Sequence, residues 1–468
     1  MGSDAYDELL KQTRELALRY IDGLDDRAVG GDVDHDALLE ALGAKLPNDP
    51  TPAQSVIHQL AEGADPGLVA TTSGRFFGFV EGGVLPAALA ADWLASTWDQ
   101  NPGFYALSPA AAVVEEVAAG WLLELLGLPG SASVGFTTGA QMASVAGLAA
   151  ARHHVLNAAG WNVEADGLIG APPVTVIVGG ERHATIDRAL RLLGLGERTA
   201  VIVPADAQGR MDPYELVATL ERTDPGPTIV CAQAGNVNTG AFDPLRRIAE
   251  ATRERDAWLH VDGAFGLWAG ASPQLRHLVD GVELADSWAT DGHKWLNTPY
   301  DSGIVVCAHP DSHRAALALH APYLVRQKVD DSPTSARRDG TDWTPESSRR
   351  ARAFAVWAAI RSLGRNGIAD MIDRCCAHAQ LFATQLAEHP DLRVLNEVVL
   401  NQVLLRVGDN DDRTRATVRF LQQEGQVWLG DTVWHDTVAI RISVSDQATT
   451  KADVEMAVAR IVEAASRT

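Results

Sequence analysis

The chain of 468 residues is long enough for two or more domains, each with a sizeable core. Hydrophobic residues make up 46% of it and charged residues 21%, a balance that excludes an intrinsically disordered protein. The 61 acidic and 39 basic residues give a formal net charge of −22, which disfavours a nucleic-acid-binding protein because such proteins need a basic surface.

Cysteine usage and the lack of long apolar runs indicate the compartment. The four cysteines include the adjacent pair Cys375 and Cys376, and none are spaced as in a Cys-x-x-Cys motif. The amino terminus lacks the apolar segment of a secretion signal, and the chain has no run of 18 uncharged apolar residues that would span a membrane. We therefore expect a cytoplasmic protein without disulfides, without a metal site and without a membrane partner.

Residues 1–105 are predicted to be mainly helical. Apolar residues recur at helical spacing from about Asp4 to Ala64, and an alanine-rich run from about Leu85 to Gln100 predicts a further helix. Between these runs lies the segment GRFFGFVEGG at residues 74–83. Aromatic rings beside glycines are typical either of a pocket wall or of ordinary packing, and the residues alone leave both open.

Residues 106–325 alternate short β-branched runs with stretches long enough for crossover helices. The runs are VTVIVGG, TAVIVP, TIVCAQAG, WLHVDG and DSGIVVCA. This alternation predicts an α/β domain with a mostly parallel sheet covered on both faces, in which ligands bind beyond the carboxyl ends of the strands. Residues 326–468 are predicted to form a loop and a small α+β domain, in which helices accompany the strand-like runs QVLLRV and VAIRISVS.

Four segments near the predicted strand ends carry residue types that would suit one cofactor. The turn Gly139–Gln141 opens a long helix, and a helix N-terminus favours a phosphate. His183 follows a strand that ends in two glycines. Asp262 ends an apolar strand, where a carboxylate usually faces a cation or a donor. Lys294 in DGHKWLN is a candidate nucleophile towards an aldehyde. Each has an ordinary structural interpretation, but their order on one sheet favours chemistry.

In this order the motifs resemble those of the pyridoxal-phosphate-dependent group II amino acid decarboxylases, which include aromatic amino acid, glutamate, cysteine sulfinate and diaminobutyrate decarboxylases. HVDGAFG and DGHKWLN carry the resemblance most specifically, and it extends from FFGFV to IRISVSDQATT. It implies fold type I, with a dimer-forming helical segment at 1–105, a large cofactor-binding domain with a seven-stranded-type sheet at 106–325 and a loop with the small carboxyl-terminal domain at 326–468. It also implies pyridoxal 5'-phosphate as the cofactor and a homodimer with a shared active site.

The resemblance assigns the cofactor contacts residue by residue. Lys294 matches the lysine that forms the internal aldimine, and His293 matches its neighbour at the phosphate. Asp262 matches the aspartate that pairs with the pyridinium nitrogen, Ala264 packs under the ring and His183 stacks on its other face. The remaining contacts are the phosphate loop Gly139, Ala140 and Gln141, together with Asn236, which stands where relatives usually carry a threonine.

The implied reaction is decarboxylation of an L-amino acid to an amine and carbon dioxide. Tyr323 matches a loop tyrosine that protonates the substrate carbon after carbon dioxide leaves, and relatives with phenylalanine there tend to form aldehydes. Decarboxylative oxidative deamination or transamination on the same site is the alternative. Because Lys294, Asp262, His183 and Tyr323 are all present, a homologue that binds the cofactor without catalysis is disfavoured.

The substrate itself is left open. By position Phe79, Val80 and Glu81 match the segment that lines the side-chain pocket, and Asn101 belongs to a segment that the partner subunit contributes. Glu81 would meet a polar or cationic side chain, or would simply be solvated. Arg441 would hold a substrate carboxylate, or would pair with a nearby acid.

Overall fold

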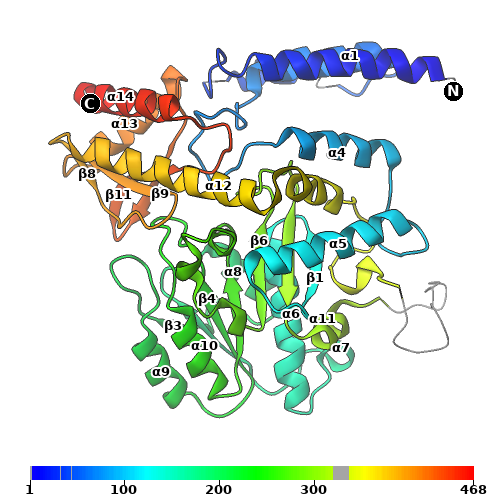
Figure 1. The fold of residues 1–468 in the computed structure, drawn as a ribbon, viewed down its shortest axis with the longest axis vertical. Coiled ribbons are helices and arrows are strands. Elements are labelled where there is room, and N and C mark those ends of the chain that lie inside the picture. Colours follow the sequence, from blue (N-terminus) through cyan, green and yellow to red (C-terminus); the bar gives the residue numbers. More distant parts are fainter. Residues whose placement is uncertain (1–2, 32, 44, 320–336) are drawn as a thin grey trace.

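Two β-sheets organise the chain in the computed structural model, which describes residues 3–31, 33–43, 45–319 and 337–468. A seven-stranded sheet occupies one part of the molecule, and a four-stranded sheet lies towards the end that holds the carboxyl terminus (Figure 1). In the described part of the chain, no helix is long and apolar enough to cross a membrane.

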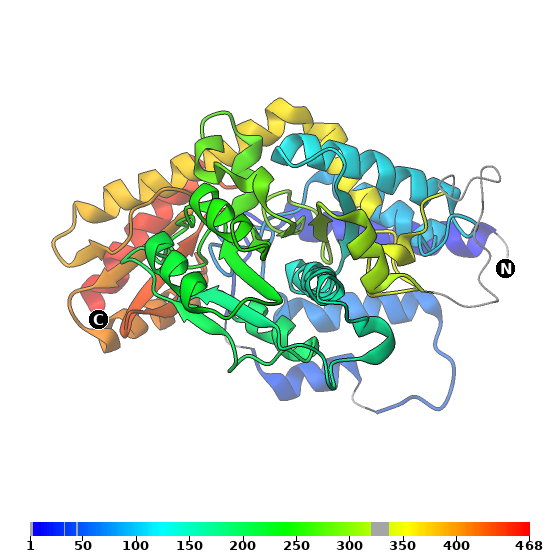
Figure 2. The same ribbon diagram turned by 90° about the horizontal axis from the view of Figure 1, so that it is seen from below.

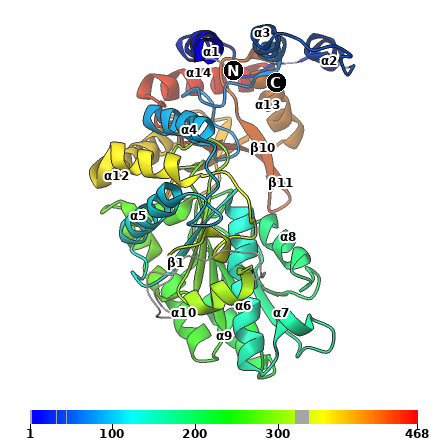
Figure 3. The same cartoon turned by 90° about the vertical axis from the view of Figure 1, so that its right-hand side faces the viewer.

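Three amino-terminal helices pack against one another at one end of the molecule, far from the large sheet (Figures 1 and 3). They are α1 (Ser3–Asp22), α2 (His35–Leu42) and α3 (Ala53–Ala64). Helix α2 begins at Asp34, whose side chain accepts two backbone N–H groups of the first turn, and ends at the left-handed Gly43. Many apolar side chains of these helices are exposed, including Tyr6, Leu10, Ile21, Leu39 and Leu60.

Two further helices pack against the long helix α12 (Ala353–Ala387). They are α4 (Pro86–Trp98) and α5 (Pro109–Leu126), and each starts with a proline. A backbone N–H at the first helical position has no intrahelical acceptor, so proline, which lacks this group, loses no hydrogen bond there. Helix α12 changes direction at Gly364, which has φ 61° and ψ 179°. Two helical segments therefore meet at a kink there.

The seven-stranded sheet has the order β1-β7-β6-β5-β4-β2-β3. Strand β7 runs antiparallel to both of its neighbours, β1 and β6, and the other pairs are parallel. The strands are β1 (Ser133–Thr137), β2 (Thr175–Gly179), β3 (Val201–Val203), β4 (Thr228–Gln233), β5 (Trp258–Asp262), β6 (Ser287–Asp291) and β7 (Gly303–Cys307). The prediction of a mostly parallel, seven-stranded-type sheet is confirmed.

Helices cover both faces of this sheet (Figure 2). On one face lie α6 (Ala140–Ala158), α8 (Ala184–Leu192) and α11 (Pro310–Leu317), with the short α7 (Val163–Asp166) after α6. On the other lie α9 (Pro213–Arg222) and α10 (Leu245–Arg253), together with α5. Because both faces are covered, every residue of β4, β5, β6 and β7 is buried.

The carboxyl-terminal region forms an antiparallel sheet in the order β10-β11-β9-β8. Its strands are β8 (Leu392–Val394), β9 (Gln402–Val407), β10 (Gly430–Trp434) and β11 (Thr437–Ser443), and its helices are α13 (Asp411–Glu424) and α14 (Lys451–Arg467). Helix α14 begins with a capping box between Thr450 and Asp453.

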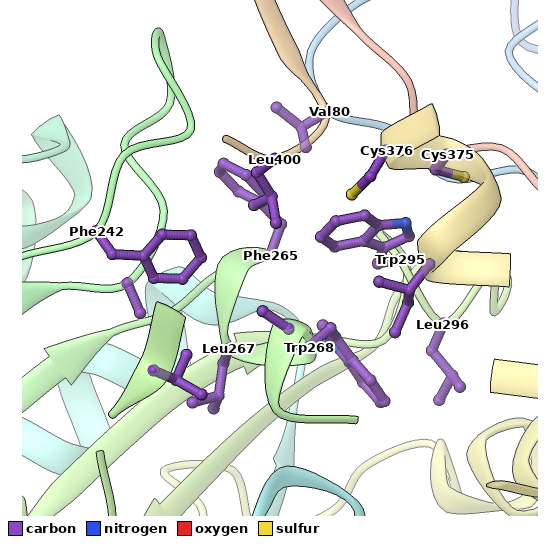
Figure 4. Close-up of a cluster of buried hydrophobic side chains, with 14 of the residues drawn as sticks. Val80, Phe242, Phe265, Leu267, Trp268, Trp295, Leu296, Cys375, Cys376 and Leu400 are labelled. Atoms are coloured by element: carbon purple, nitrogen blue, oxygen red, sulfur yellow. The ribbon is translucent and has the colours of Figure 1, made fainter. Parts of the chain in front are cut away.

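A cluster of buried side chains joins the large sheet to α12 (Figure 4). Trp295 and Leu296, both fully buried, follow Lys294 directly in the chain. The cluster also contains Val80, Phe265, Trp268, Cys375 and Cys376. Such packing leaves little freedom to the backbone next to Lys294, so the lysine projects from a rigid base.

Candidate active site

A cavity of about 310 Å³ lies where β5 and β6 end and α6 begins. Its size falls within the range of small-molecule sites, roughly 300–1,000 Å³. The predicted residues that line it are Gly139, Ala140, Gln141, His183, Asp262, Ala264, His293 and Lys294. Segments that lie up to 155 residues apart in sequence thus meet where the sheet topology places ligands.

Asp262 ends β5 and is 6% exposed. Its Oδ1 accepts the N–H of Ala264 at 3.2 Å. Burial raises the pKa of Asp262, while His183 and Lys294 nearby act in the opposite direction. A buried carboxylate of this kind suits a cationic partner, such as a protonated ring nitrogen.

His183 faces the same cavity and caps the N-terminus of α8. Its Nδ1 accepts the backbone N–H of Thr185 at 3.3 Å and lies 2.8 Å from the Thr185 hydroxyl. Since a backbone N–H can only donate, Nδ1 carries no proton and the neutral ring carries its proton on Nε2. Burial is the main cause that lowers the pKa of His183, which favours the neutral ring.

Lys294 and His293 share one carboxylate, that of Asp291 at the end of β6. Lys294 Nζ lies 3.1 Å from Asp291 Oδ2, and His293 Nε2 lies 3.3 Å from Asp291 Oδ1. Asp291 Oδ1 also accepts the backbone N–H of Ala140 at 2.6 Å. Asp291 was not predicted as a site residue, although it resembles Asp262 in being an acid at the end of a buried strand.

The N-terminus of α6 is shaped for close approach. Gly139 precedes the helix without a side-chain cap, and a Cβ there would lie 3.2 Å from the His293 ring. Gln141 donates its Nε2 to the Thr185 carbonyl at 3.1 Å, and its buried Oε1 has no hydrogen-bond partner among residues in the described ranges. Open helix amides, a lysine amine and the Asp262 carboxylate therefore border one cavity. They fit a ring cofactor with a phosphate, an aldehyde and a basic ring nitrogen.

The side chains of Asn236 and Asn101 make hydrogen bonds to backbone groups of their own and of other loops. Asn236 donates to the Glu181 carbonyl at 3.1 Å, and its Oδ1 accepts the N–H groups of Asn238 and Thr239. It is absent from the lining of the cavity, which includes its neighbours Gly235 and Val237. Asn101 Oδ1 accepts the N–H of Gly103 at 2.9 Å.

The segment at residues 76–83 passes over the backbone of Lys294. A Cβ on Gly82 would lie 1.8 Å from the Lys294 carbonyl oxygen, so only glycine fits there. Both Phe79 and Val80 have positive φ angles, 51° and 61°, which turn the chain so that Val80 is buried and Phe79 is 60% exposed. The Phe79 ring stacks on Trp428 with a centroid distance of 5.1 Å.

Glu81, in the same segment, hydrogen-bonds to Tyr300, whose ring stacks on His293 with centroids 4.2 Å apart. Burial is the main cause that raises the pKa of Glu81 and also that of Tyr300. Tyr300 was not predicted as a site residue. The only signal for it was its place six residues after Lys294, in a loop.

Arg441 on β11 lies near enough to His183 to help lower the pKa of that histidine. Within the described ranges its guanidinium makes no hydrogen bond or ion pair, and burial lowers its pKa. Tyr323 lies outside the described residues. No group of three or more metal-ligating side chains occurs in the part of the chain that the structure covers.

Comparison with known proteins agrees with this geometry. Residues 36–407 match the model of the pyridoxal-dependent decarboxylase conserved domain. An aromatic-L-amino-acid decarboxylase of Bacillus atrophaeus is 26% identical over 96% of this chain and 94% of its own. An acidic amino acid decarboxylase of Bos taurus is 28% identical over 70% of this chain and 62% of its own. The crystal structure of Oryza sativa TDC with PLP and tryptamine superposes with a TM-score of 0.92 at 24% identity, covering 100% of this chain and 99% of that one.

Proposed function

Because this chain belongs to the pyridoxal-dependent decarboxylase family, and so decarboxylates an amino acid with pyridoxal phosphate, we propose that its substrate is an L-amino acid with an aromatic side chain. The observation that carries this proposal is the aromatic ring next to the lysine: Tyr300 stacks on His293, the residue before Lys294. Phe79 is exposed on the segment whose Gly82 packs against the Lys294 carbonyl, and its ring stacks on Trp428. The aromatic relative of Bacillus atrophaeus supports the same substrate class.

Glu81 narrows the substrate class further. Its carboxylate accepts a hydrogen bond from Tyr300 and retains further acceptor capacity. An aromatic side chain that carries a donor, such as a phenol or an indole N–H, would donate a hydrogen bond to the Glu81 carboxylate next to Tyr300. We expect such substrates to be preferred over phenylalanine.

The cofactor supplies an electron-withdrawing ring that accepts the electrons of the breaking bond to the carboxylate. Asp262 would hold a proton on the ring nitrogen, because its buried carboxylate is placed to face a cation. Lys294 supplies the amine that binds the cofactor aldehyde, and Ala264 offers a small side chain beneath the ring. Gly139, Ala140, Gln141 and His293 would hold the phosphate at the α6 terminus.

We assign the orientation of the substrate to His183 and Arg441. The guanidinium of Arg441, which has no partner among the described residues, is suited to a substrate carboxylate, and the Nε2–H of the nearby His183 is a neutral donor. Together they would bind and orient the substrate carboxylate. That orientation selects loss of carbon dioxide over loss of a proton from the same carbon.

The proposed general acid is Tyr323, which the family resemblance assigns. A Tyr323→Phe enzyme should keep its cofactor but release more aldehyde and hydrogen peroxide and less amine. Tyr300→Phe is the matched control, because it removes a hydroxyl beside His293 and should leave the product an amine. Unchanged amine yield in Tyr323→Phe would remove Tyr323 from the reaction.

We also propose a cytoplasmic homodimer in which residues 1–105 cover the partner subunit. The exposed apolar side chains of α1 to α3, and those of Trp93, Leu94 and Trp98 on α4, form a surface that one chain leaves bare. Asn101, which follows α4, would then border the partner's site. Sedimentation should show a dimer, and an active monomer would refute this assignment.

The substrate assignment is tested by a screen of the purified enzyme against aromatic, acidic and cationic L-amino acids. Carbon dioxide, amine and hydrogen peroxide are measured for each. Carbon dioxide with an equal amount of amine from tyrosine, tryptophan or a hydroxylated relative is expected. Turnover confined to acidic or cationic amino acids would overturn the proposed substrate class, and peroxide in step with carbon dioxide would favour the aldehyde-forming alternative.

A further inference from the structure

The carboxylate of Asp291 occupies the place where the phosphate is expected. Its side chain is 4% exposed and lies in the lining of the cavity. One oxygen accepts the Ala140 N–H at 2.6 Å, at the open N-terminus of the 19-residue helix α6. The same carboxylate reaches His293 Nε2 at 3.3 Å and Lys294 Nζ at 3.1 Å. The Ala140 N–H and the His293 Nε2–H are donors that an incoming phosphate would also use, because His293 Nδ1 already accepts the N–H of Ser302.

The Asp291 carboxylate and the cofactor phosphate are both anions, and they would compete for the N-terminus of α6. A helix N-terminus attracts one anion strongly, because its free N–H groups and the helix dipole act together. A cofactor phosphate carries about −1.5 to −2 charges near neutral pH, and like charges a few ångströms apart repel. The small Gly139 leaves room beside Asp291 Oδ1, since a Cβ there would lie 3.4 Å from it.

We propose that Asp291 is a resident anion. In the cofactor-free protein it holds the α6 terminus and the Lys294 ammonium in place, and it yields the Ala140 N–H when the cofactor phosphate binds. Asp291 is thus a positioning residue. It keeps the site ordered before the cofactor binds, and it weakens the affinity of the site for phosphate. This inference rests on the phosphate seat proposed above, but it does not depend on the substrate.

The test compares Asp291→Asn with wild type, using the full-length protein freed of cofactor with hydroxylamine. Three ligands are titrated: inorganic phosphate, pyridoxal phosphate and pyridoxal, which lacks the phosphate. Inorganic phosphate binding is followed by calorimetry, and the other two by the absorbance of the bound cofactor. Asp187→Asn is the control, because Asp187 pairs with Arg182 on α8 and its replacement removes the same charge without touching Ala140.

Asp291→Asn should bind inorganic phosphate about tenfold more tightly, the change expected for roughly one like charge removed at short range. The ratio of pyridoxal phosphate affinity to pyridoxal affinity should rise by a similar factor, and Asp187→Asn should match wild type. The ratio cancels any change in Lys294, which loses the same counterion towards both aldehydes. Unchanged or weaker inorganic phosphate binding in Asp291→Asn would overturn the inference.

Asp291→Ser is the second variant, because a hydroxyl still accepts the Ala140 N–H without a charge, and it should behave as Asp291→Asn does. If neither variant folds, Asp291 is a structural cap only and the inference fails. If wild type forms no complex with pyridoxal phosphate on Lys294, the proposed cofactor site is wrong instead. The inorganic phosphate titration still decides the role of Asp291 in that case.

Discussion

The two walls of the active site are built differently. The sheet wall, made of Asp262, Asp291, His293 and Lys294, lines the cavity with strand ends and the turn after β6, and Asp291 pairs with both His293 and Lys294. We call Phe79, Glu81 and Tyr300 the outer wall; they lie on loops beyond the lining of the cavity, and Phe79 and Tyr300 are 60% and 57% exposed. Chemistry common to a family needs fixed geometry, whereas substrate choice can vary on loops. We therefore assign cofactor chemistry to the sheet wall and substrate selection to the outer wall.

The largest effect is expected at the sheet wall, from Asp262→Asn. The neutral amide cannot hold a proton on the cofactor ring, so kcat should fall roughly 10³-fold, the order seen when one preorganised electrostatic group is removed. The substrate KM should change little. Steady-state kinetics with saturating cofactor checks this, and a kcat within threefold of wild type would separate Asp262 from the chemistry. Asp187→Asn serves as the charge-matched control.

A buried carboxylate stands behind the outer wall and should limit stability at alkaline pH. Asp446 is 2% exposed, its Oδ2 has no partner among the residues described, and burial raises its pKa to about 7. A raised pKa means that the folded state binds the proton more tightly than the unfolded state, so stability falls as pH rises from about 4 to 7. Asp446→Asn should therefore gain about 3 kcal/mol at pH 8 and little at pH 5.

Urea unfolding at the two pH values measures this gain. Asp243→Asn is the matched control, because burial also raises the pKa of Asp243 to about 7, but both of its oxygens accept backbone N–H groups at 2.7 Å. An amide nitrogen there would face a donor, so Asp243→Asn should gain less or lose stability. Equal gains in the two variants would show that hydrogen bonding does not separate them.

We propose that Arg441 binds the substrate carboxylate, so its loss should appear in substrate binding. Arg441→Gln should raise the substrate KM about 30-fold, since a charge-assisted hydrogen bond contributes roughly 1.5–3 kcal/mol. Cofactor affinity should stay within twofold. Arg441→Lys keeps the charge and should recover part of the loss. An unchanged KM in Arg441→Gln would return Arg441 to a purely structural role on β11.

The smallest effect belongs to the outer wall itself. Glu81→Gln should lower the preference for tyrosine over phenylalanine by about fivefold, the equivalent of one neutral hydrogen bond of roughly 1 kcal/mol, while activity on phenylalanine changes little. The measurement is the ratio of kcat/KM for the two substrates. If the ratio does not move, Glu81 serves only to hold Tyr300.

The same division separates the features that could be predicted from the sequence from those that could not. The apolar, β-branched runs predicted β2, β3, β4, β5 and β7, whereas β1 and β6 were missed. Strand β6 reads SWATD, and its burial comes from neighbours rather than from its own residues. The charged helix α13 was also missed. These omissions reflect tertiary packing that a local pattern does not contain.

At the site, Lys294, His293 and Asp262 line one cavity because topology brings strand ends together, which the order of the motifs indicated. Asp291 also stands at the end of a buried strand, and it was not predicted only because β6 was not recognised as a strand. Tyr300 and the loop bonds of Asn236 were beyond prediction. They depend on loop conformations that no periodicity encodes.

The attachment of the cofactor to Lys294 is the central claim, and borohydride reduction tests it most directly. The chain has only five lysines, so a peptide mass map can assign the reduced adduct without ambiguity. The purified protein should be yellow, lose its colour on reduction, and carry the pyridoxyl mass on the peptide that contains Lys294. An adduct on another lysine, or an equal adduct in Lys294→Ala, would contradict the account.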